Sequence, residues 1–389
     1  MTRQRYSNDW QTAEPLAQSV QYAANHGEQP MKQTLLTQLA GGTLILVAGL
    51  GLANAAECQK KYYSPDWVAQ PPKVDVYNYV RAETDLQFKG YSEKYKAFGK
   101  FAHSRKPYDV HKQVTQSGNR DTLYSFGVFD LSKSPLTIEL PETGGRYMSL
   151  MPVSQDHDVY PALYAPGKWT FTEKETGTRY IMFGIRTFAD PNSKEDLARA
   201  HKLQDAVRVS QSNQGDLSGI PAWNEKKMME LRKDFNNLGS TLPDSSTFFG
   251  VKCDRSYLQN ALGVAVGWGG LQRRDALYLP VQVPRNDGKT AYTLTVPRDV
   301  PIEDNGFWSV TVYNKDRFME PNDLDAYSFN KVTARKNEDG SATIHFGGNP
   351  KADNYLPIME GWVSIIRLYR PKKALLDGIW KFPEPVEAK

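Results

Sequence analysis

The stretch FWSVTVY, residues 307–313, alternates two kinds of side chain as a β-strand does. Successive side chains of a strand point to opposite faces, so Trp308 and Val310 share one face while Ser309 and Thr311 share the other. We expect the apolar face of this strand, Trp308 included, to be buried in a hydrophobic core.

Similar strand-like runs, separated by turns of Gly, Pro, Asn and Asp, occur in both halves of the chain. The 29 glycines and 24 prolines among 389 residues agree with a fold of many turns. The first half holds runs at 123–129, 136–140, 147–153, 169–172 and 180–188, and the second at 276–283, 292–296, 307–313, 328–333, 343–346 and 362–369. So many short strands predict a mainly β fold with two β-sandwich or jelly-roll-like domains.

Helical patterns lie before and between the two β regions. Apolar spacing predicts a leading helix over residues 73–89, and Ser193 can cap a second helix over 193–207. A third, highly charged helix is expected over about 222–237. The predicted organisation is an upstream segment with signal peptide (1–55), an N-terminal β domain with its leading helix (56–189), a helical connector (190–250) and a C-terminal jelly-roll-like domain (251–389).

The N-terminal region has the features of a cleavable signal peptide. Lys32 supplies a positive charge, residues 39–52 are apolar, and the small residues 53–55 predict cleavage after Ala55. Met31 is a plausible natural start, so residues 1–30 are set aside. The alternative is an uncleaved anchor. We expect a periplasmic or secreted protein with no stable membrane span once the signal is removed.

The two cysteines, Cys58 and Cys253, both follow the predicted cleavage point. In an oxidising compartment an even pair can form one disulfide, but spacing alone leaves this open.

Composition and missing motifs exclude several classes of function. The net charge of +4 is spread along the chain, without the basic and aromatic interleaving of a nucleic-acid groove. The sequence has no phosphate-binding glycine loop and no dinucleotide fingerprint, so no nucleotide cofactor is expected. Gly263, Gly267, Gly269 and Gly270 surround Trp268, and we interpret this stretch as a packed turn or a tight helix end.

One candidate catalytic group is centred on His157, which lies between Asp156 and Asp158 after a predicted strand. A neighbouring carboxylate can fix the tautomer of an imidazole, as a general base or a metal ligand requires. Asp121, His157 and Arg146 are therefore candidate catalytic residues, and Asp156 and Asp158 candidate ligands of a divalent metal. In an extended segment, however, neighbouring side chains point apart, and a polar loop at a strand end explains the motif equally.

The second candidate region begins at a predicted strand. Asn119, Arg120 and Tyr124 crowd polar groups there, where a guanidinium could hold a carboxylate or a sugar hydroxyl. Arg186, inside an apolar strand, is the fourth candidate ligand-binding residue. The alternatives are a hydrogen-bonded turn at Asn119 and structural ion pairs for the strand arginines Arg186 and Arg367.

These motifs carry a resemblance that spans nearly the whole mature chain. The first half resembles the bacterial domain of unknown function numbered 1254, and the second half resembles the one numbered 1214. The matching segments are NRDTLYS (119–125), GRY (145–147), GTRY (177–180), LQD (203–205), FWSVTVY (307–313), DGS (339–341), NYLP (354–357), RLYRP (367–371) and DGIW (377–380). The resemblance implies an exported two-domain β protein with a jelly-roll-like second half and no assigned activity.

Two classes of function follow from the sequence. The first is a binding or interaction protein of the cell envelope or exterior, which takes a small molecule or a glycan, since the chain is rich in aromatic residues. The second is a hydrolase or lyase with an Asp, His and Arg site, which would work with or without a divalent metal. Edge strands of the sandwiches could pair two copies into a homo-oligomer.

Overall fold

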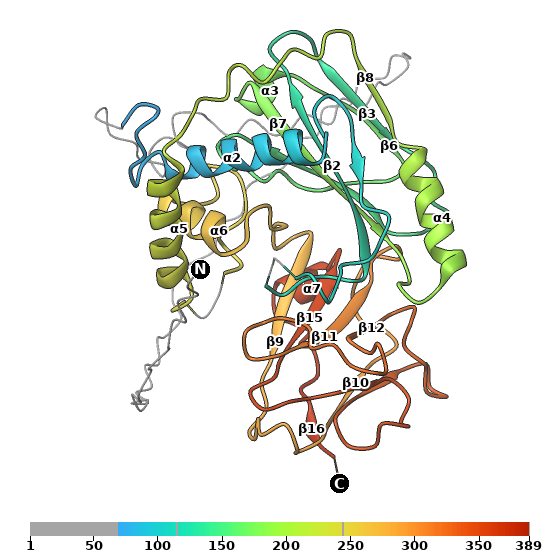
Figure 1. Cartoon of the computed structure of the whole chain (residues 1–389). Helices are drawn as coiled ribbons and strands as arrows, with labels where there is room; N and C mark the ends of the chain where they lie inside the picture. The colour runs from blue at the N-terminus through green and yellow to red at the C-terminus, as the bar shows by residue number, and fades with distance from the viewer. Residues whose placement is uncertain (1–68, 114–115, 243–244, 389) are drawn as a thin grey trace, which may run out of the picture. The chain divides into compact units, whose positions relative to one another are not determined.

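The computed structural model describes residues 69–113, 116–242 and 245–388. In these residues sixteen strands form four sheets, and the strands fall close to the predicted runs (Figure 1). The mainly β fold expected from the alternating sequence is confirmed.

The N-terminal sandwich consists of a five-stranded and a three-stranded antiparallel sheet. The larger sheet has the order β1 (Ala102–His103), β2 (Thr122–Asp130), β7 (Tyr180–Phe188), β4 (Met148–Ser154), β5 (Leu163–Tyr164), and the smaller has β6 (Gly167–Phe171), β3 (Leu136–Leu140), β8 (Arg208–Gln211). Phe129 and Phe183 of the larger sheet pack with Leu136 and Ile138 of the smaller one. Strand β8 lies in the segment predicted as connector and completes this sandwich.

The C-terminal sandwich packs two four-stranded sheets. One has the order β12 (Ser328–Asn330), β11 (Trp308–Tyr313), β15 (Val363–Tyr369), β9 (Ala276–Val281), and the other has β14 (Tyr355–Leu356), β13 (Ala342–Phe346), β10 (Tyr292–Val296), β16 (Val386–Glu387). Trp308 and Val310 join Leu294 and Ile344 in the core between them, and Trp308 is only 3% exposed. The prediction that Trp308 is buried with its apolar neighbours is confirmed.

The longer helices are α2 (Tyr79–Lys94), α4 (Lys194–Asp205), α5 (Glu225–Gly239) and α6 (Tyr257–Gly267), and α3 (Glu173–Thr176) and α7 (Lys373–Leu376) are single turns. Ser193 caps α4 as expected, because its hydroxyl accepts a hydrogen bond from the amide of Asp196 at 3.2 Å. Helix α6 begins with a capping box of Ser256 and Gln259. It ends at Gly267, so the glycine-rich stretch is a helix end followed by a turn.

The five-stranded sheet is covered on both faces. One face packs against the three-stranded sheet. On the other face, Val128 and Met182 contact Phe88 of α2 and Trp268, which follows α6. Figure 1 shows α2 alongside this sheet. Alternate residues of β2 and β7 therefore face two different surroundings, and the second one contains the candidate site.

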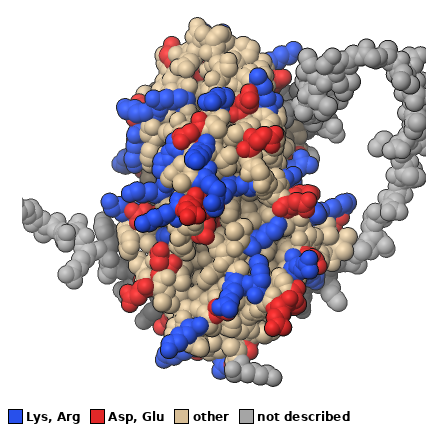
Figure 2. Space-filling view, turned by 90° about the vertical axis from the view of Figure 1, so that its right-hand side faces the viewer, with Lys and Arg blue, Asp and Glu red and all other residues tan. Residues whose placement is uncertain are grey.

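The surface carries charges of both signs. On the face seen in Figure 2, Lys and Arg side chains are interspersed with Asp and Glu. Of the helices that the structure describes, none combines the length and the apolar character needed to span a bilayer.

Several predictions concern the first 68 residues, which lie outside the described part. These are the signal peptide, its cleavage after Ala55 and the fate of Cys58. Cys253 is disulfide-bonded, and with two cysteines in the sequence this agrees with the pairing considered above.

Candidate functional site

A cavity of about 720 Å³, open to solvent, is lined by residues of both sandwiches, of α2 and of the turn after α6. Alternate residues of β2, β4 and β7 form one wall, and α2 and the turn after α6 form a second. Strands β9 and β15 of the C-terminal sandwich contribute the third. The residues that matter most are Tyr91, Asn119, Tyr124, Phe126, Arg186, Trp268, Tyr278, Arg367 and Tyr369.

Arg186 is a buried cation without an acidic partner. It lies in the middle of β7, directly opposite Tyr124 on β2, and is 8% exposed. Its guanidinium donates two long hydrogen bonds, to the sulfur of Met151 at 3.5 Å and to the carbonyl of Gly269 at 3.4 Å, and it also interacts with the hydroxyl of Tyr124. None of the described carboxylates forms an ion pair with it. A buried charge normally needs a partner, so this guanidinium has capacity for an anion in the cavity.

Arg367 has the same kind of position but different surroundings. It lies in β15 opposite Tyr278 of β9 and is 3% exposed. Its guanidinium donates to the carbonyl of Ser117 at 2.7 Å, the hydroxyl of Thr311 at 3.0 Å and the hydroxyl of Tyr313 at 2.6 Å. The structural ion pair expected for both strand arginines is not found for either among the described residues, and only Arg367 is compensated by neutral acceptors.

Asn119 forms a polar corner of the cavity with the hydroxyls of Tyr124 and Tyr369. Its carbonyl oxygen accepts the amide of Asp121 at 2.8 Å, which is the turn predicted as the structural role. Its amide nitrogen donates to the hydroxyl of Tyr369 at 2.9 Å and lies 3.5 Å from the hydroxyl of Tyr124. The same residue therefore fixes the strand entry and presents hydroxyl groups at the cavity.

Tyr124 is electrostatically coupled to Arg186. The guanidinium carbon lies 5.4 Å from the centre of the tyrosine ring. Burial, the largest single cause, would raise the pKa of Tyr124, but the charges of Arg186 and Arg367 together with hydrogen bonds from Thr122 and Arg186 outweigh it, and the pKa is lowered from its usual value.

Three of the four predicted ligand-binding residues, Asn119, Tyr124 and Arg186, meet at the cavity. The fourth, Arg120, is not among the residues that line it. Its guanidinium stacks on Tyr327 at 4.9 Å and lies 3.7 Å from a carboxylate oxygen of Asp325.

The predicted catalytic residues lie in separate networks and do not line the cavity. Asp121 is fully buried and accepts a hydrogen bond from Asn330 at 2.9 Å, and burial raises its pKa. Arg146 forms an ion pair with Asp196, with one nitrogen 2.8 Å from a carboxylate oxygen. These contacts hold strand ends and helix starts together.

His157 has both ring nitrogens occupied. Nδ1 is 3.0 Å from the amide oxygen of Asn260, and Nε2 accepts the backbone amide of Gly269 at 2.9 Å. Burial, assisted by the charge of Arg255, lowers the pKa of His157 to about 3, so the ring is neutral. Its position has a φ of +57°, in the left-handed region. The contacts describe a structural residue that supports the turn after α6.

The two aspartates that flank His157 contact cations of the protein. Asp156 forms ion pairs with Arg81 and Lys252, and Asp158 lies 3.8 Å from Arg255. The described residues contain no cluster of three or more His, Cys, Asp or Glu side chains suited to a metal. A metal bound by this pair of aspartates stays a prediction from the sequence.

Sequence reasoning did not assign Tyr91, Trp268, Tyr278 or Tyr369 to the site. The alternation of side chains in the strands of the second half did indicate part of this cavity wall. Arg367 and Tyr369 share one face of β15, and Tyr278 lies opposite Arg367, so a polar and aromatic face was present beside the apolar one. What alternation does not show is that this face meets β2 and β7.

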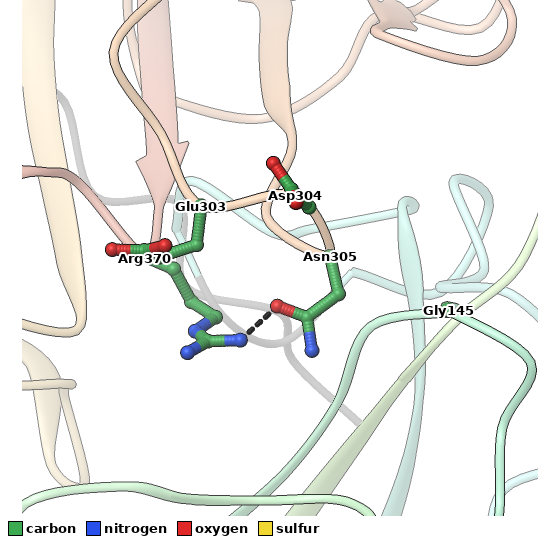
Figure 3. Close-up of a pocket in the computed structure, with 5 residues that line it drawn as sticks. All are labelled: Gly145, Glu303, Asp304, Asn305 and Arg370. Carbon is green, nitrogen blue, oxygen red and sulfur yellow. Dashed lines mark hydrogen bonds between the residues drawn. The ribbon is translucent and has the colours of Figure 1, made fainter.

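A second hollow, of about 410 Å³, lies beside the loop 303–305 (Figure 3). Arg370 points across it and donates a hydrogen bond to the side-chain oxygen of Asn305. The same guanidinium lies 4.2 Å from the ring centre of Tyr164. Because its cation is already engaged, we do not assign this hollow as the site.

The chain matches two family models, each described as a protein of unknown function: DUF1254 over residues 98–211 and DUF1214 over residues 282–373. No curated protein matches the chain. Among solved structures, the VPA0106 protein of Vibrio parahaemolyticus is similar with a TM-score of 0.61 and 20% identity, over 81% of this chain and 98% of that one. An uncharacterised protein from Burkholderia cenocepacia matches with a TM-score of 0.43 and 12% identity, over 80% and 88%. The first likeness supports the fold alone. The chain belongs to the tandem family of DUF1254 and DUF1214 proteins.

Proposed function

We propose that the protein is an exported binding protein for a small organic anion, which it holds in the cavity by Arg186. The observation that carries the proposal is the geometry of Arg186: a buried guanidinium that none of the described carboxylates pairs with, and whose contacts are Tyr124, the sulfur of Met151 and the distant carbonyl of Gly269.

The charges around the cavity favour an anion. Its described lining contains Lys106, Arg186 and Arg367 and no Asp or Glu. The three cations of the lining give the cavity a positive potential, which favours anions. The buried carboxylates of Asp121, which interacts with Arg367, and of Asp275, which interacts with Arg186, reduce this potential.

The shape of the guanidinium favours a carboxylate. Arginine presents paired N–H groups in a plane, which match the two oxygens of a carboxylate. The rest of the lining is largely aromatic, and an apolar cavity with a few polar groups is typical of small-molecule sites. The ligand is therefore an organic acid with an apolar body.

The geometry favours a binding protein over a hydrolase or lyase. An enzyme of the kind considered from the sequence needs Asp121, Arg146 and His157 in one cleft. Each of the three instead has its own partners outside the cavity, and both nitrogens of His157 are occupied.

Isothermal titration calorimetry with three acids and their neutral amides tests the proposal. Hexanoate, 3-cyclohexylpropionate and 3-phenylpropionate are each compared with the corresponding amide. We expect every acid that binds to bind at least about tenfold more tightly than its amide, since hydrogen bonds to charged groups contribute roughly 1.5–3 kcal/mol. Arg186→Met should abolish this difference.

Arg335→Gln is the matched control, because Arg335 is exposed and pairs with Asp353 at 2.9 Å. It should leave all affinities unchanged. Acids and amides that bind equally to the wild-type protein, or an unchanged preference in Arg186→Met, would contradict the proposal.

Export is the second part of the proposal. It is supported by Lys32, the apolar residues 39–52 and the small residues 53–55, and by the disulfide at Cys253. N-terminal sequencing of the protein purified from its native host should begin at Ala56, and a chain that retains residues 31–55 would contradict cleavage.

A further inference from the structure

We infer that the ligand is an aromatic carboxylic acid whose ring stacks on a row of aromatic side chains while its carboxylate meets Arg186. The inference rests on the proposed function and adds the class of ligand. The row, called the aromatic row below, consists of Tyr95, Tyr91, Phe126 and Tyr124.

The aromatic row runs from solvent to the buried cation. Tyr95 is 53% exposed, and its ring centre lies 5.6 Å from that of Tyr91. Tyr91 lies 4.7 Å from Phe126, and Phe126 is stacked on Tyr124 at 5.6 Å with an angle of 13° between the ring planes. Tyr124 then faces Arg186 at 5.4 Å. All four rings line the cavity, so a ligand passes them before it reaches the guanidinium.

The rings are held by rigid elements. Tyr91 belongs to α2, and Tyr124 and Phe126 belong to β2. Trp268 lies 6.4 Å from Tyr91, and its indole nitrogen donates to the hydroxyl of Thr84 at 3.2 Å. Because the rings are already placed, little ordering is needed on binding, which favours affinity.

The distribution of polar groups distinguishes an aromatic acid from a sugar acid. The amide of Asn119 lies within 3.5 Å of the hydroxyls of Thr122, Tyr124 and Tyr369, and Tyr124 is the residue opposite Arg186. Along the row the wall is formed by the faces of four rings, and each of the three tyrosines adds one hydroxyl. A sugar acid carries several hydroxyl groups, and each one left unpaired against a ring face costs free energy, while an aromatic body carries none.

Ring contacts also distinguish an aromatic body from a saturated one. Stacked or edge-on ring pairs contribute a preference beyond the area they bury. The aliphatic side chains of the lining, Met151, Val153 and Met182, lie on β4 and β7 rather than along the row. An alkyl or cyclohexyl acid would therefore use the cation but gain nothing from the ring geometry.

The test compares 3-phenylpropionate with 3-cyclohexylpropionate by calorimetry on the full mature protein. The aromatic acid should bind about 2- to 10-fold more tightly, the range that a ring pair provides. Phe126→Leu should remove this preference, while the affinity for the cyclohexyl acid stays within about twofold. Tyr91→Leu is the second variant and should have the same effect if Phe126→Leu does not fold.

Phe382→Leu is the matched control. Phe382 packs against Trp380 in the C-terminal sandwich and does not line the cavity, so the preference should persist in it. Equal or tighter binding of the cyclohexyl acid, or tighter binding of glucuronate than of 3-phenylpropionate, overturns the inference and leaves the anion site intact. If none of the carboxylates binds, the proposed function itself fails.

Discussion

Arg186 and Arg367 both lie in strands and both line the cavity, but their guanidinium groups differ in the hydrogen bonds they make. Each lies in an inner strand of its sheet, opposite a tyrosine of the neighbouring strand, and each is almost fully buried. Around Arg367, backbone carbonyls and hydroxyls accept hydrogen bonds at 2.6–3.0 Å. Around Arg186 the hydrogen bonds to Met151 and Gly269 are 3.4 Å and longer. Burial therefore does not separate the two arginines, whereas the hydrogen bonds that their donors make do.

The largest effect is expected for Arg367, the arginine whose guanidinium donates to several close acceptors of the protein. Arg367→Met removes the donors to Ser117, Thr311 and Tyr313 and leaves buried acceptors unsatisfied. Each such group costs roughly 1–3 kcal/mol, so we expect the free energy of unfolding to fall by about 3–5 kcal/mol in total. Urea denaturation followed by circular dichroism measures it. A loss below about 1 kcal/mol, similar to that of the exposed control Arg335→Gln, would remove the distinction.

A smaller effect concerns His157, which resembles Arg367 in that its polar atoms are all paired. The pKa of the folded state is about 3, against 6.5 for the free side chain. As the pH falls below about 6.5 the unfolded chain binds a proton that the folded protein excludes, so stability is lost. Between about pH 7.5 and about pH 5 this contribution is roughly 2 kcal/mol.

The matched variant is His157→Asn, because asparagine tolerates the left-handed backbone at this position. We expect His157→Asn to have a lower free energy of unfolding than the wild type at every pH. When the pH falls from about 7.5 to about 5, the free energy of unfolding of the variant should decrease by about 2 kcal/mol less than that of the wild type. If the two proteins lose stability equally, His157 does not exclude the proton in the folded state.

The smallest expected effect has the opposite sign. Arg186→Met replaces a buried, poorly compensated cation with an apolar side chain of similar length, so the unliganded protein should be unchanged or more stable by about 1 kcal/mol. The same urea titration, without carboxylates in the buffer, measures it. A loss as large as that of Arg367→Met would place Arg186 among the structural residues.

Much of the fold could be predicted from the sequence, because alternation is a local signal. The predicted run 180–188 coincides with β7, and 136–140 with β3. The two-residue strands β1, β5, β14 and β16 were missed because two residues carry no periodic pattern. Strand β8, of four residues, was also missed and lies in the segment predicted as the helical connector. Helix α6 was missed because its glycines have low helix propensity, which tertiary packing overrides.

The site was less predictable, because its parts meet only in three dimensions. Asn119, Tyr124 and Arg186 were found from their residue types within a single domain. The opposite wall depends on how β9 and β15 approach β2 and β7, and no local pattern carries that information. His157 was overrated for the same reason: its sequence neighbours are carboxylates, but its actual partners, Asn260 and Gly269, are about a hundred residues away.

The division of the cavity wall between two domains bears on how such proteins are inherited. Tyr124 and Arg186 belong to the segment matched by one family model, and Arg367 and Tyr369 to the segment matched by the other. A recombination event that passed on either domain alone would give a protein with only part of the cavity wall. The cavity is complete only when both domains are present, which gives a physical reason for the two domains to occur together in tandem.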